Sequence, residues 1–189
     1  MTPEISLINL TPSHFNDVIE LGNEVHGDGY LFLDTLMAIY KKGLKDNLNA
    51  SYVLYEQNKL IGFRLSYAPH QWSFDQWCSP ELWPVAPNNV AYFKCNTIHP
   101  SHQGKGYGGI LLAKSIETLK EMGAKAGLSH IWMQSPGNAS FKYFTKAGGT
   151  LIKTHPRRWH DDPNIPDYVC ILCGHDCFCD ASEMLLEFK

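Results

Sequence analysis

A strand pattern, a proline and a cluster of glycines stand directly before a helical pattern, and this succession constrains the fold more than any other part of the chain. Residues 90–98 alternate as a strand, Pro100 follows, and four glycines lie within positions 104–109. The helix after them is expected to bury one stripe of residues, namely Gly109, Leu112, Ala113, Ile116 and Leu119. A glycine-rich turn that opens a helix leaves bare N–H groups at the positive end of the helix dipole. The stretch therefore predicts a strand–loop–helix unit suited to bind a phosphate.

The two common nucleotide loops do not fit this turn. It lacks the Gly-Lys-Ser/Thr of a P-loop, and it satisfies Gly-x-Gly-x-x-Gly only through its last glycine, Gly109. An ordinary loop-to-helix turn stays an alternative. Charge favours a ligand, because residues 100–158 carry nine basic and two acidic side chains, whereas the flanking segments are net acidic. Solvated lysines on helix faces are the other explanation of this excess.

Composition bounds the class of protein. At 189 residues and 44% hydrophobic content, the chain is expected to form one domain with one core. We see neither a run long enough to cross a membrane nor a signal peptide, so a cytoplasmic protein with six reduced cysteines and no membrane partner is expected. The net charge of −3 argues against nucleic-acid binding. Nothing in the sequence indicates the oligomeric state.

The coarse element order is β-α-α-β-β-β-α-β-α-β-β, which predicts an α/β sheet of mixed direction. Along residues 90–98, Ala91, Phe93, Cys95 and Thr97 are expected on one face. Residues 69–89 hold four prolines and three tryptophans and are expected to be a long ordered loop. The other expected elements are strands at 5–10, 129–135, 150–154 and 167–172, helices at 11–25, 32–48 and 138–147, and a hairpin over 51–68 that turns at Gln57-Asn58.

Two motifs resemble those of GNAT-type acyltransferases. The first, Ile98-His-Pro-Ser-His-Gln-Gly-Lys-Gly-Tyr-Gly108, matches the family's Val-x-Pro-x-x-Gln/Arg-x-x-Gly-x-Gly/Ala loop. The second, residues 137–149, resembles the family's Asn-x-x-Ala-x-x-x-Tyr-x-Lys-x-Gly-Phe segment. The resemblance covers residues 5 to about 173 and implies a mixed, mostly antiparallel central sheet flanked by helices. It implies an acyltransferase domain over residues 1–168, with a last strand and a cysteine-rich tail, residues 169–189, packed on it.

The resemblance also implies a cofactor and a reaction. Acetyl-coenzyme A would donate its acetyl group directly to a primary amine of a small molecule or peptide. The backbone of Asn96, Thr97 and Ile98 would pair with the pantetheine arm, and Asn138 of the second motif would contact the cofactor. The pyrophosphate would lie on the amides of the loop, which comprises Gln103, Gly104, Lys105, Gly106, Tyr107, Gly108 and Gly109.

Acyl transfer requires a base for the amine, stabilisation of the oxyanion and an acid for the leaving thiolate. The family's tyrosine acid has no unambiguous counterpart, because one alignment places Phe144 there and another leaves Tyr143 two residues early. We take Tyr143 as the candidate acid; the alternative is that Phe144 lines the pocket. For the base we take Glu24, with His26 and Asp28 of the same segment as alternatives. The aromatic residues of the long loop could wall an acceptor pocket or merely cover the sheet (Trp72, Phe74, Trp77 and Trp83).

The C-terminal segment carries four cysteines within ten residues: Cys170, Cys173, Cys177 and Cys179. Cys-x-x-Cys followed by Gly is typical of a zinc knuckle, and Cys-x-Cys would supply the second pair of thiolates. Reduced structural cysteines and a disulfide are the alternatives, and His175 is a possible substitute ligand. A non-catalytic acyl-coenzyme A sensor and a zinc-stabilised interaction module are the alternative functions.

Overall fold

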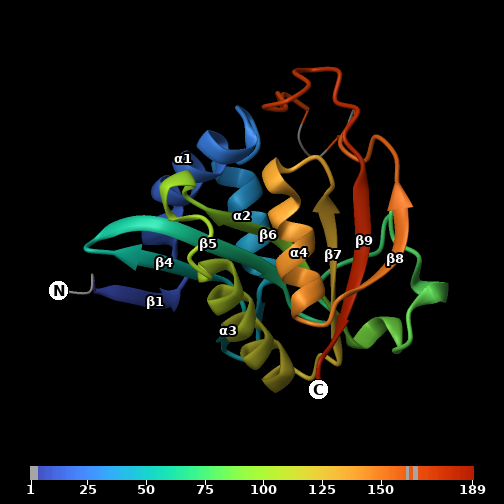
Figure 1. The fold of residues 1–189 in the computed structure, drawn as a ribbon. Coiled ribbons are helices and arrows are strands. Elements are labelled where there is room, and N and C mark those ends of the chain that lie inside the picture. The colour runs from blue at the N-terminus through green and yellow to red at the C-terminus, as the bar shows by residue number, and fades with distance from the viewer. Residues whose placement is uncertain (1–3, 161, 164–165) are drawn as a thin grey trace.

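The computed structural model describes residues 4–160, 162–163 and 166–189, and it consists of a seven-stranded sheet with helices on both faces (Figure 1). The strands lie in the order β1-β4-β5-β6-β7-β9-β8. The sheet strands are β1 (Ile5–Asn9), β4 (Tyr52–Glu56), β5 (Lys59–Tyr67), β6 (Val90–Ile98), β7 (Ala126–Trp132), β8 (Thr150–His155) and β9 (Ala181–Glu187). The helices are α1 (Phe15–His26), α2 (Leu33–Lys42), α3 (Tyr107–Glu121) and α4 (Ala139–Lys146).

The direction of the strands confirms the expected mixed, mostly antiparallel sheet. Strands β6 and β7 run parallel, and each other neighbouring pair in this sheet is antiparallel. One core lies between the sheet and the pair α1 and α2, and a second lies between the sheet and the pair α3 and α4. The two helix pairs therefore cover opposite faces. In the part of the chain described, no helix is long and apolar enough to cross a bilayer.

The second helix is shorter than the sequence pattern predicts. It ends at Lys42, and residues 44–49 form a small hairpin of β2 (Leu44–Lys45) and β3 (Leu48–Asn49) instead of continuing it to residue 48. Asp46 and Asn47 both have positive φ, 51° and 63°, as a two-residue hairpin turn requires. This turn chemistry overrides the helical spacing of the apolar residues. The expected hairpin around Gln57-Asn58 is confirmed as β4 and β5.

A β-bulge in β6 corrects the expected distribution of its side chains. Leu65 pairs with Cys95 and Ser66 with Phe93, so Lys94 is an extra residue with no partner across the ladder. The alternation slips by one position at Lys94. Phe93 consequently packs in the core under α3 and α4, and Cys95 packs in the core under α1 and α2, although the sequence placed both on one face.

The buried stripe of α3 also differs from the expected one. Leu112 and Leu119 are buried as expected, but Gly109 and Ala113 are exposed and Ile116 is only partly buried. The stripe is completed by Leu111, Ser115 and Thr118. Two polar residues take these places because each has a partner: Ser115 Oγ donates to the Ala50 carbonyl (2.9 Å), and Thr118 Oγ1 lies 2.6 Å from Tyr52 Oη.

The strand expected at 167–172 is not formed, and the last strand is β9, which lies between β7 and β8. Residues Ala181 to Leu186 of this strand are all buried. Its sequence therefore lacks the alternation of apolar and polar residues that indicates a half-buried strand. Glu183 is wholly buried because its carboxylate accepts hydrogen bonds from the Ser79 amide and hydroxyl (2.8 and 2.9 Å), Trp83 Nε1 (2.9 Å) and His155 Nε2 (2.8 Å).

These bonds also hold the long loop, residues 69–89, against the sheet. The loop contains two short 3-10 turns, Pro80–Leu82 and Pro87–Asn89, and is otherwise irregular, as the sequence predicts. Trp83 is buried in a core with residues of β6, β7 and β9, and Trp72 Nε1 donates to the Val90 carbonyl (2.9 Å). The loop therefore acts as a packed cover at one end of the sheet.

Candidate functional site

The glycine loop is an open cradle of backbone amides at the start of α3. Gly104 and Gly106 have φ of 76° and 85°, a conformation that favours glycine. Among the described residues, the N–H groups of Gly104, Lys105 and Gly106 have no acceptor. The Tyr107 and Gly108 N–H groups at the start of α3 likewise have no acceptor among the described residues, whereas Gly109 N donates to the Gly106 carbonyl (3.0 Å). A Cβ at Gly106 or Gly109 would meet nothing within 4 Å, so the cradle is open to an anion of the size of a phosphate.

Strands β6 and β7 separate beside this loop. Their pairing runs from Val90↔Ala126 to Tyr92↔Leu128 and then stops. Asn96, Thr97 and Ile98 lie on the diverging part of β6, where the edge that faces β7 has no strand beside it. The Asn96 Oδ1 atom is buried and has no hydrogen-bond partner among the described residues. The opening thus offers backbone and side-chain polar groups to an extended ligand.

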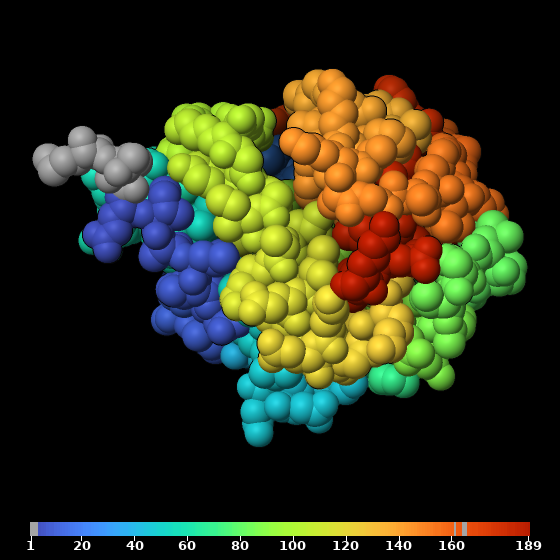
Figure 2. Space-filling view, turned by 60° about the horizontal axis from the view of Figure 1, so that its bottom comes forward, coloured from blue at the N-terminus to red at the C-terminus, as the bar shows by residue number. Residues whose placement is uncertain are grey.

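A cavity of about 610 Å³ lies at this divergence and is lined by residues from both faces of the sheet. On the outer surface, Figure 2 shows a hollow between the stretch that contains the glycine loop and the stretch that contains α4, with atoms of the N-terminal part of the chain visible inside it. The cavity reaches from Tyr143 of α4 to His26 at the end of α1. A ligand that enters beside the glycine loop could therefore meet a second ligand from the α1–α2 side.

Tyr143 lines this cavity, whereas Phe144 is wholly buried in the core below α4. The Arg64 Nη1 group donates to Tyr143 Oη (3.1 Å). Arg64 is 1% exposed, its guanidinium lies 4.4 Å from the centroid of the Phe93 ring, and its Nε has no partner among the described residues. A buried cation thus holds the phenol oxygen as an acceptor and leaves the phenol proton free to point elsewhere.

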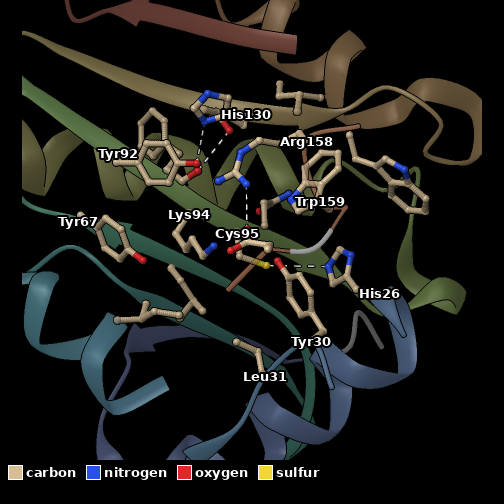
Figure 3. A pocket seen from close by; sticks show the side chains of 18 of the residues that line it. His26, Tyr30, Leu31, Tyr67, Tyr92, Lys94, Cys95, His130, Arg158 and Trp159 are labelled. Atoms are coloured by element: carbon tan, nitrogen blue, oxygen red, sulfur yellow. Dashed lines mark hydrogen bonds and ion pairs between the residues drawn. The ribbon is translucent and has the colours of Figure 1, made fainter. Parts of the chain in front are cut away.

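The structure does not bring Glu24 to this cavity. Its side chain is 53% exposed and lies 3.7 Å from His99 Nε2, in a separate surface depression. His26 lines the cavity instead, with Nε2 2.8 Å from Thr97 Oγ1 and 3.9 Å from Cys95 Sγ (Figure 3). Burial lowers the pKa of His26 from 6.5 to about 4, so its imidazole is neutral at neutral pH.

The Lys94 side chain extends from the bulge of β6 into the cavity beside Cys95 (Figure 3). Burial and the nearby Arg158 cation lower its pKa, and no hydrogen bond or ion pair of its amino group occurs in the described residues. Arg158 is paired with Asp162 (2.9 Å) and lies 3.5 Å from Asp75. No role was predicted for Lys94 or Arg64; a charged residue among the apolar residues of a strand is the signal that could have found them.

The remaining wall on the α1–α2 side is largely aromatic and includes Tyr30, Tyr67, Trp72, Tyr92, Trp159 and Tyr168. Of the loop tryptophans, Trp72 lines the cavity, while Trp83 belongs to the core. Trp77 lies under Arg158, 5.3 Å from its guanidinium. The aromatic residues of the loop therefore divide between the cavity wall and the packed cover of the sheet.

The four cysteines of the C-terminal segment converge. The Sγ atoms of Cys170, Cys173, Cys177 and Cys179 all lie within 4.8 Å of one another, and none is in a disulfide. Two of the separations are 3.4 and 3.9 Å. Gly174, with φ of 73°, lets the chain turn back, and the Cys170 and Gly174 backbones exchange two hydrogen bonds (3.0 and 2.9 Å). Four sulfur atoms this close together could hold one metal ion.

Residues 15–148 match the family model described as "Acetyltransferase (GNAT) family". No curated protein sequence matches the chain significantly.

Solved structures share the fold at low sequence identity. An N-acetyltransferase from Staphylococcus aureus Mu50 is 16% identical, with a TM-score of 0.69 over 98% of this chain and 99% of that one. A putative acetyltransferase, yncA, from Salmonella typhimurium, solved with acetyl-CoA, is 18% identical, with a TM-score of 0.67 over 98% and 94%. Naa50 from Arabidopsis thaliana, in complex with the bisubstrate analogue CoA-Ac-MVNAL, is 12% identical, with a TM-score of 0.65 over 97% and 99%.

Proposed function

Because the chain belongs to the acetyltransferase (GNAT) family, we propose that it transfers the acetyl group of acetyl-CoA directly to a primary amine. The observation that carries this proposal is the continuity of the site. An open cradle of amides, a strand edge without a neighbour and a cavity that contains a tyrosine and a neutral histidine follow one another along β6. Acetyl-CoA has the same three parts in the same order, namely phosphates, an extended pantetheine arm and a reactive thioester.

The cofactor contacts follow from this fit. Gln103 to Gly109 receive the pyrophosphate, and Gln103 supports the loop by donating from Nε2 to the Ile98 carbonyl (3.1 Å). The backbone of Asn96, Thr97 and Ile98 pairs with the amides of the pantetheine arm. Asn138, at the start of α4, has a buried Oδ1 without a partner among the described residues, which a donor on the arm would satisfy.

Tyr143 acts as the general acid for the leaving thiolate. Its oxygen accepts a hydrogen bond from Arg64, so its own proton is available to a sulfur atom placed at the divergence of β6 and β7. The Arg64 cation also favours any anionic charge that develops next to it. The carboxylate of Glu24 is too far out on the surface to serve the same centre.

His26 acts as the base for the acceptor amine. It is neutral above about pH 4 and is therefore able to accept a proton. A base of such low pKa takes the amine proton only as the C–N bond forms, because the nitrogen becomes acidic at that stage. Its hydrogen bond with Thr97 fixes the ring.

The acceptor enters from the α1–α2 side, between the aromatic residues of that wall. Asp34 and Asp75 are carboxylates among the residues that line the cavity, and they attract a cationic amine before it loses its proton. Both a small aromatic amine and the first residues of a peptide are compatible with a cavity of about 610 Å³.

The test is release of free coenzyme A thiol from acetyl-CoA over a panel of amines and short peptides. We expect amine-dependent release with at least one acceptor, and the mass of that acceptor to rise by one acetyl group. Acetyl-CoA binding by calorimetry without release, over the whole panel, would instead favour a non-catalytic acyl-CoA sensor. Absence of binding would refute both functions.

We further propose that the four-cysteine cluster holds a structural zinc ion. Four thiolates at about 2.3 Å from a tetrahedral zinc lie about 3.8 Å apart, which agrees with the separations of 3.4 and 3.9 Å. Such a site has no open position, so zinc would supply no chemistry. Elemental analysis should find about one zinc per chain, and Cys78→Ser, which removes a thiol outside the cluster, should keep it. The six free thiols suit a reducing compartment, and we propose the cytoplasm.

A further inference from the structure

The cysteine segment contacts the connection between α1 and α2, more than 130 residues earlier in the chain. Tyr168 Oη donates to the His26 carbonyl (3.0 Å), and the Val169 amide donates to the Asp28 carbonyl (3.0 Å). The two backbones approach so closely that a Cβ on Gly27 would lie 2.0 Å from the Val169 carbonyl oxygen. Gly27 also has φ of 116°, which favours glycine. This contact is therefore a tight, specific junction.

The cysteine segment, residues 167–180, has little regular structure or apolar packing to keep its shape. Its other polar contacts lie toward its C-terminal end, where Asp176 pairs with Arg157 (2.8 Å) and Asp180 bonds with Arg157 and Gln134 (3.1 and 2.9 Å). Apart from the Cys170–Gly174 bridge, residues 167–180 form no strand or helix. Its large apolar side chains are mostly outside, since Ile171, Leu172 and Phe178 are more than half exposed. The buried residues at its centre are cysteines. Protonated thiols make only weak hydrogen bonds, whereas a bound metal would fix all four side chains and the turns between them.

The same segment forms part of the cavity wall. Tyr168, Cys170, Cys177 and Cys179 line the cavity together with His26 and Tyr30. We infer that a zinc ion held by the four cysteines fixes the acceptor-side wall of the cavity, by holding Tyr168 and Val169 against His26 and Asp28. The assignment of this wall to the acceptor rests on the proposed acetyl transfer, whereas the order of the wall rests only on the proposed zinc ion.

Amide hydrogen exchange measures this directly and needs no acceptor. In the α1–α2 connection, the Gly27 amide donates to the Asn23 carbonyl (2.9 Å) and the Leu31 amide to Asn23 Oδ1 (2.8 Å). We expect removal of zinc by a chelator to speed exchange in residues 27–31 and 168–174 by about tenfold or more. Exchange in α3, which belongs to the opposite face, should change by less than about twofold. Addition of zinc should restore the original rates.

Substitutions distinguish the effect of the metal from the effect of the contact between Tyr168 and His26. Cys173→Ser removes the ligand that is only partly buried and should reproduce the effect of chelation, whereas Cys78→Ser should leave both zinc content and exchange unchanged. Tyr168→Phe keeps the four thiols and should keep zinc, but it loses the bond to His26 and should speed exchange in residues 27–31 by about threefold. Zinc content is measured on every sample.

Three results would overturn the inference. They are absence of zinc from protein refolded or purified with zinc, unchanged exchange in residues 27–31 after its removal, and an equal loss of protection in α3. The last would mean that the metal holds the whole fold and not this wall. Acetyl-CoA binding, measured by calorimetry with and without zinc, should be unchanged. A protein that binds no acetyl-CoA in either form refutes the proposed function and leaves the exchange result intact.

Discussion

Arg64 and Tyr143 form a polar pair inside the cavity, and the pair comes from elements that are far apart in the sequence. Arg64 lies on β5 and Tyr143 on α4, yet their 3.1 Å hydrogen bond orients the phenol. A buried arginine without a carboxylate partner among the described residues is costly unless a ligand or a polar neighbour uses its charge. The pair is therefore the most specific sign of chemistry at the level of single residues.

Replacing the phenol tests its role as an acid. Tyr143→Phe should lower kcat roughly 100-fold, because the leaving thiolate then has no proton donor. Acetyl-CoA affinity should stay within about twofold, since the ring keeps its packing. Steady-state release of the coenzyme A thiol measures kcat, and calorimetry measures the affinity for acetyl-CoA. Full turnover by the variant would remove Tyr143 from the mechanism.

A side chain in the glycine loop tests the cofactor cradle. A Cβ at Gly108 lies 3.1 Å from Asn96 Nδ2, so Gly108→Val should displace Asn96 and fill the space beside the free amides. Acetyl-CoA affinity should fall by at least roughly tenfold, about 1.4 kcal/mol, by calorimetry. Ala113→Val, at an exposed position of the same helix, is the matched control for the β-branched side chain. Equal affinities for the two variants would contradict the placement of the cofactor.

Strand β9 and the loop over residues 69–89 depend on each other at the scale of elements. The buried Glu183 carboxylate of β9 receives donors from Ser79, Trp83 and His155. Burial by itself raises the pKa of Glu183, but the hydrogen bonds from these residues outweigh it and the pKa is lowered. One carboxylate thus anchors a loop with little regular structure, and the loop carries Trp72 to the cavity.

Loss of the Glu183 carboxylate should destabilise the folded protein. Glu183→Ala leaves several buried donors without an acceptor and should lower the free energy of unfolding by about 3–5 kcal/mol. Glu187→Ala, at the exposed end of the same strand, should change it by less than about 0.5 kcal/mol. Denaturant unfolding measures both. Similar values for the two variants would show that Glu183 does not hold the loop.

For the molecule as a whole, the divergence of β6 and β7 joins the two faces of the sheet. The glycine loop and α4 lie on one side, and His26 and the aromatic wall lie on the other. The C-terminal chain supplies both the strand β9 and the cysteine segment that contacts the α1–α2 connection. We therefore propose that residues 1–168 and 169–189 form one domain.

Two partly buried histidines, His26 and His130, make the stability of this domain depend on pH. Burial lowers the pKa of His26 and of His130 to about 4, below the value of 6.5 of an exposed histidine. Between pH 6.5 and 4 the unfolded chain binds more protons than the folded one, so stability falls as the pH falls through this window. Each histidine contributes up to about 1.4 kcal/mol per pH unit.

Urea unfolding at pH 7, 6 and 5 measures this loss. His26→Asn should reduce the slope between pH 6.5 and 5, because one of the two groups no longer titrates. The exposed His70 provides a control, since His70→Asn should leave the slope unchanged. A stability that does not change from pH 7 to pH 5 would mean that both histidines titrate normally in the folded protein.

Structural features with local causes could be predicted from the sequence alone. The turn before α3, the hairpin at Gln57-Asn58 and the presence of the four helices were predictable, because turn chemistry and periodicity act within a few residues. The end of α2 and the buried stripe of α3 were not. The family motifs predicted the fold class, and the cysteine spacing predicted a cluster before any coordinates, although what that cluster binds stays a proposal.

The direction and burial of several side chains depend on residues that are distant in the sequence, so they became clear only in the folded structure. The bulge at Lys94 arises from pairing with β5, and it sends Phe93 and Cys95 to opposite faces against the period of the sequence. Nothing in the sequence marks Glu183 as buried, because its hydrogen-bond donors lie up to 104 residues away. Which of Glu24, His26 and Asp28 lines the cavity depended in the same way on the direction of the side chains near the end of α1, and of the three it is His26. Burial of a polar group is decided by its partners, and partners brought together by folding leave no pattern in the neighbouring sequence.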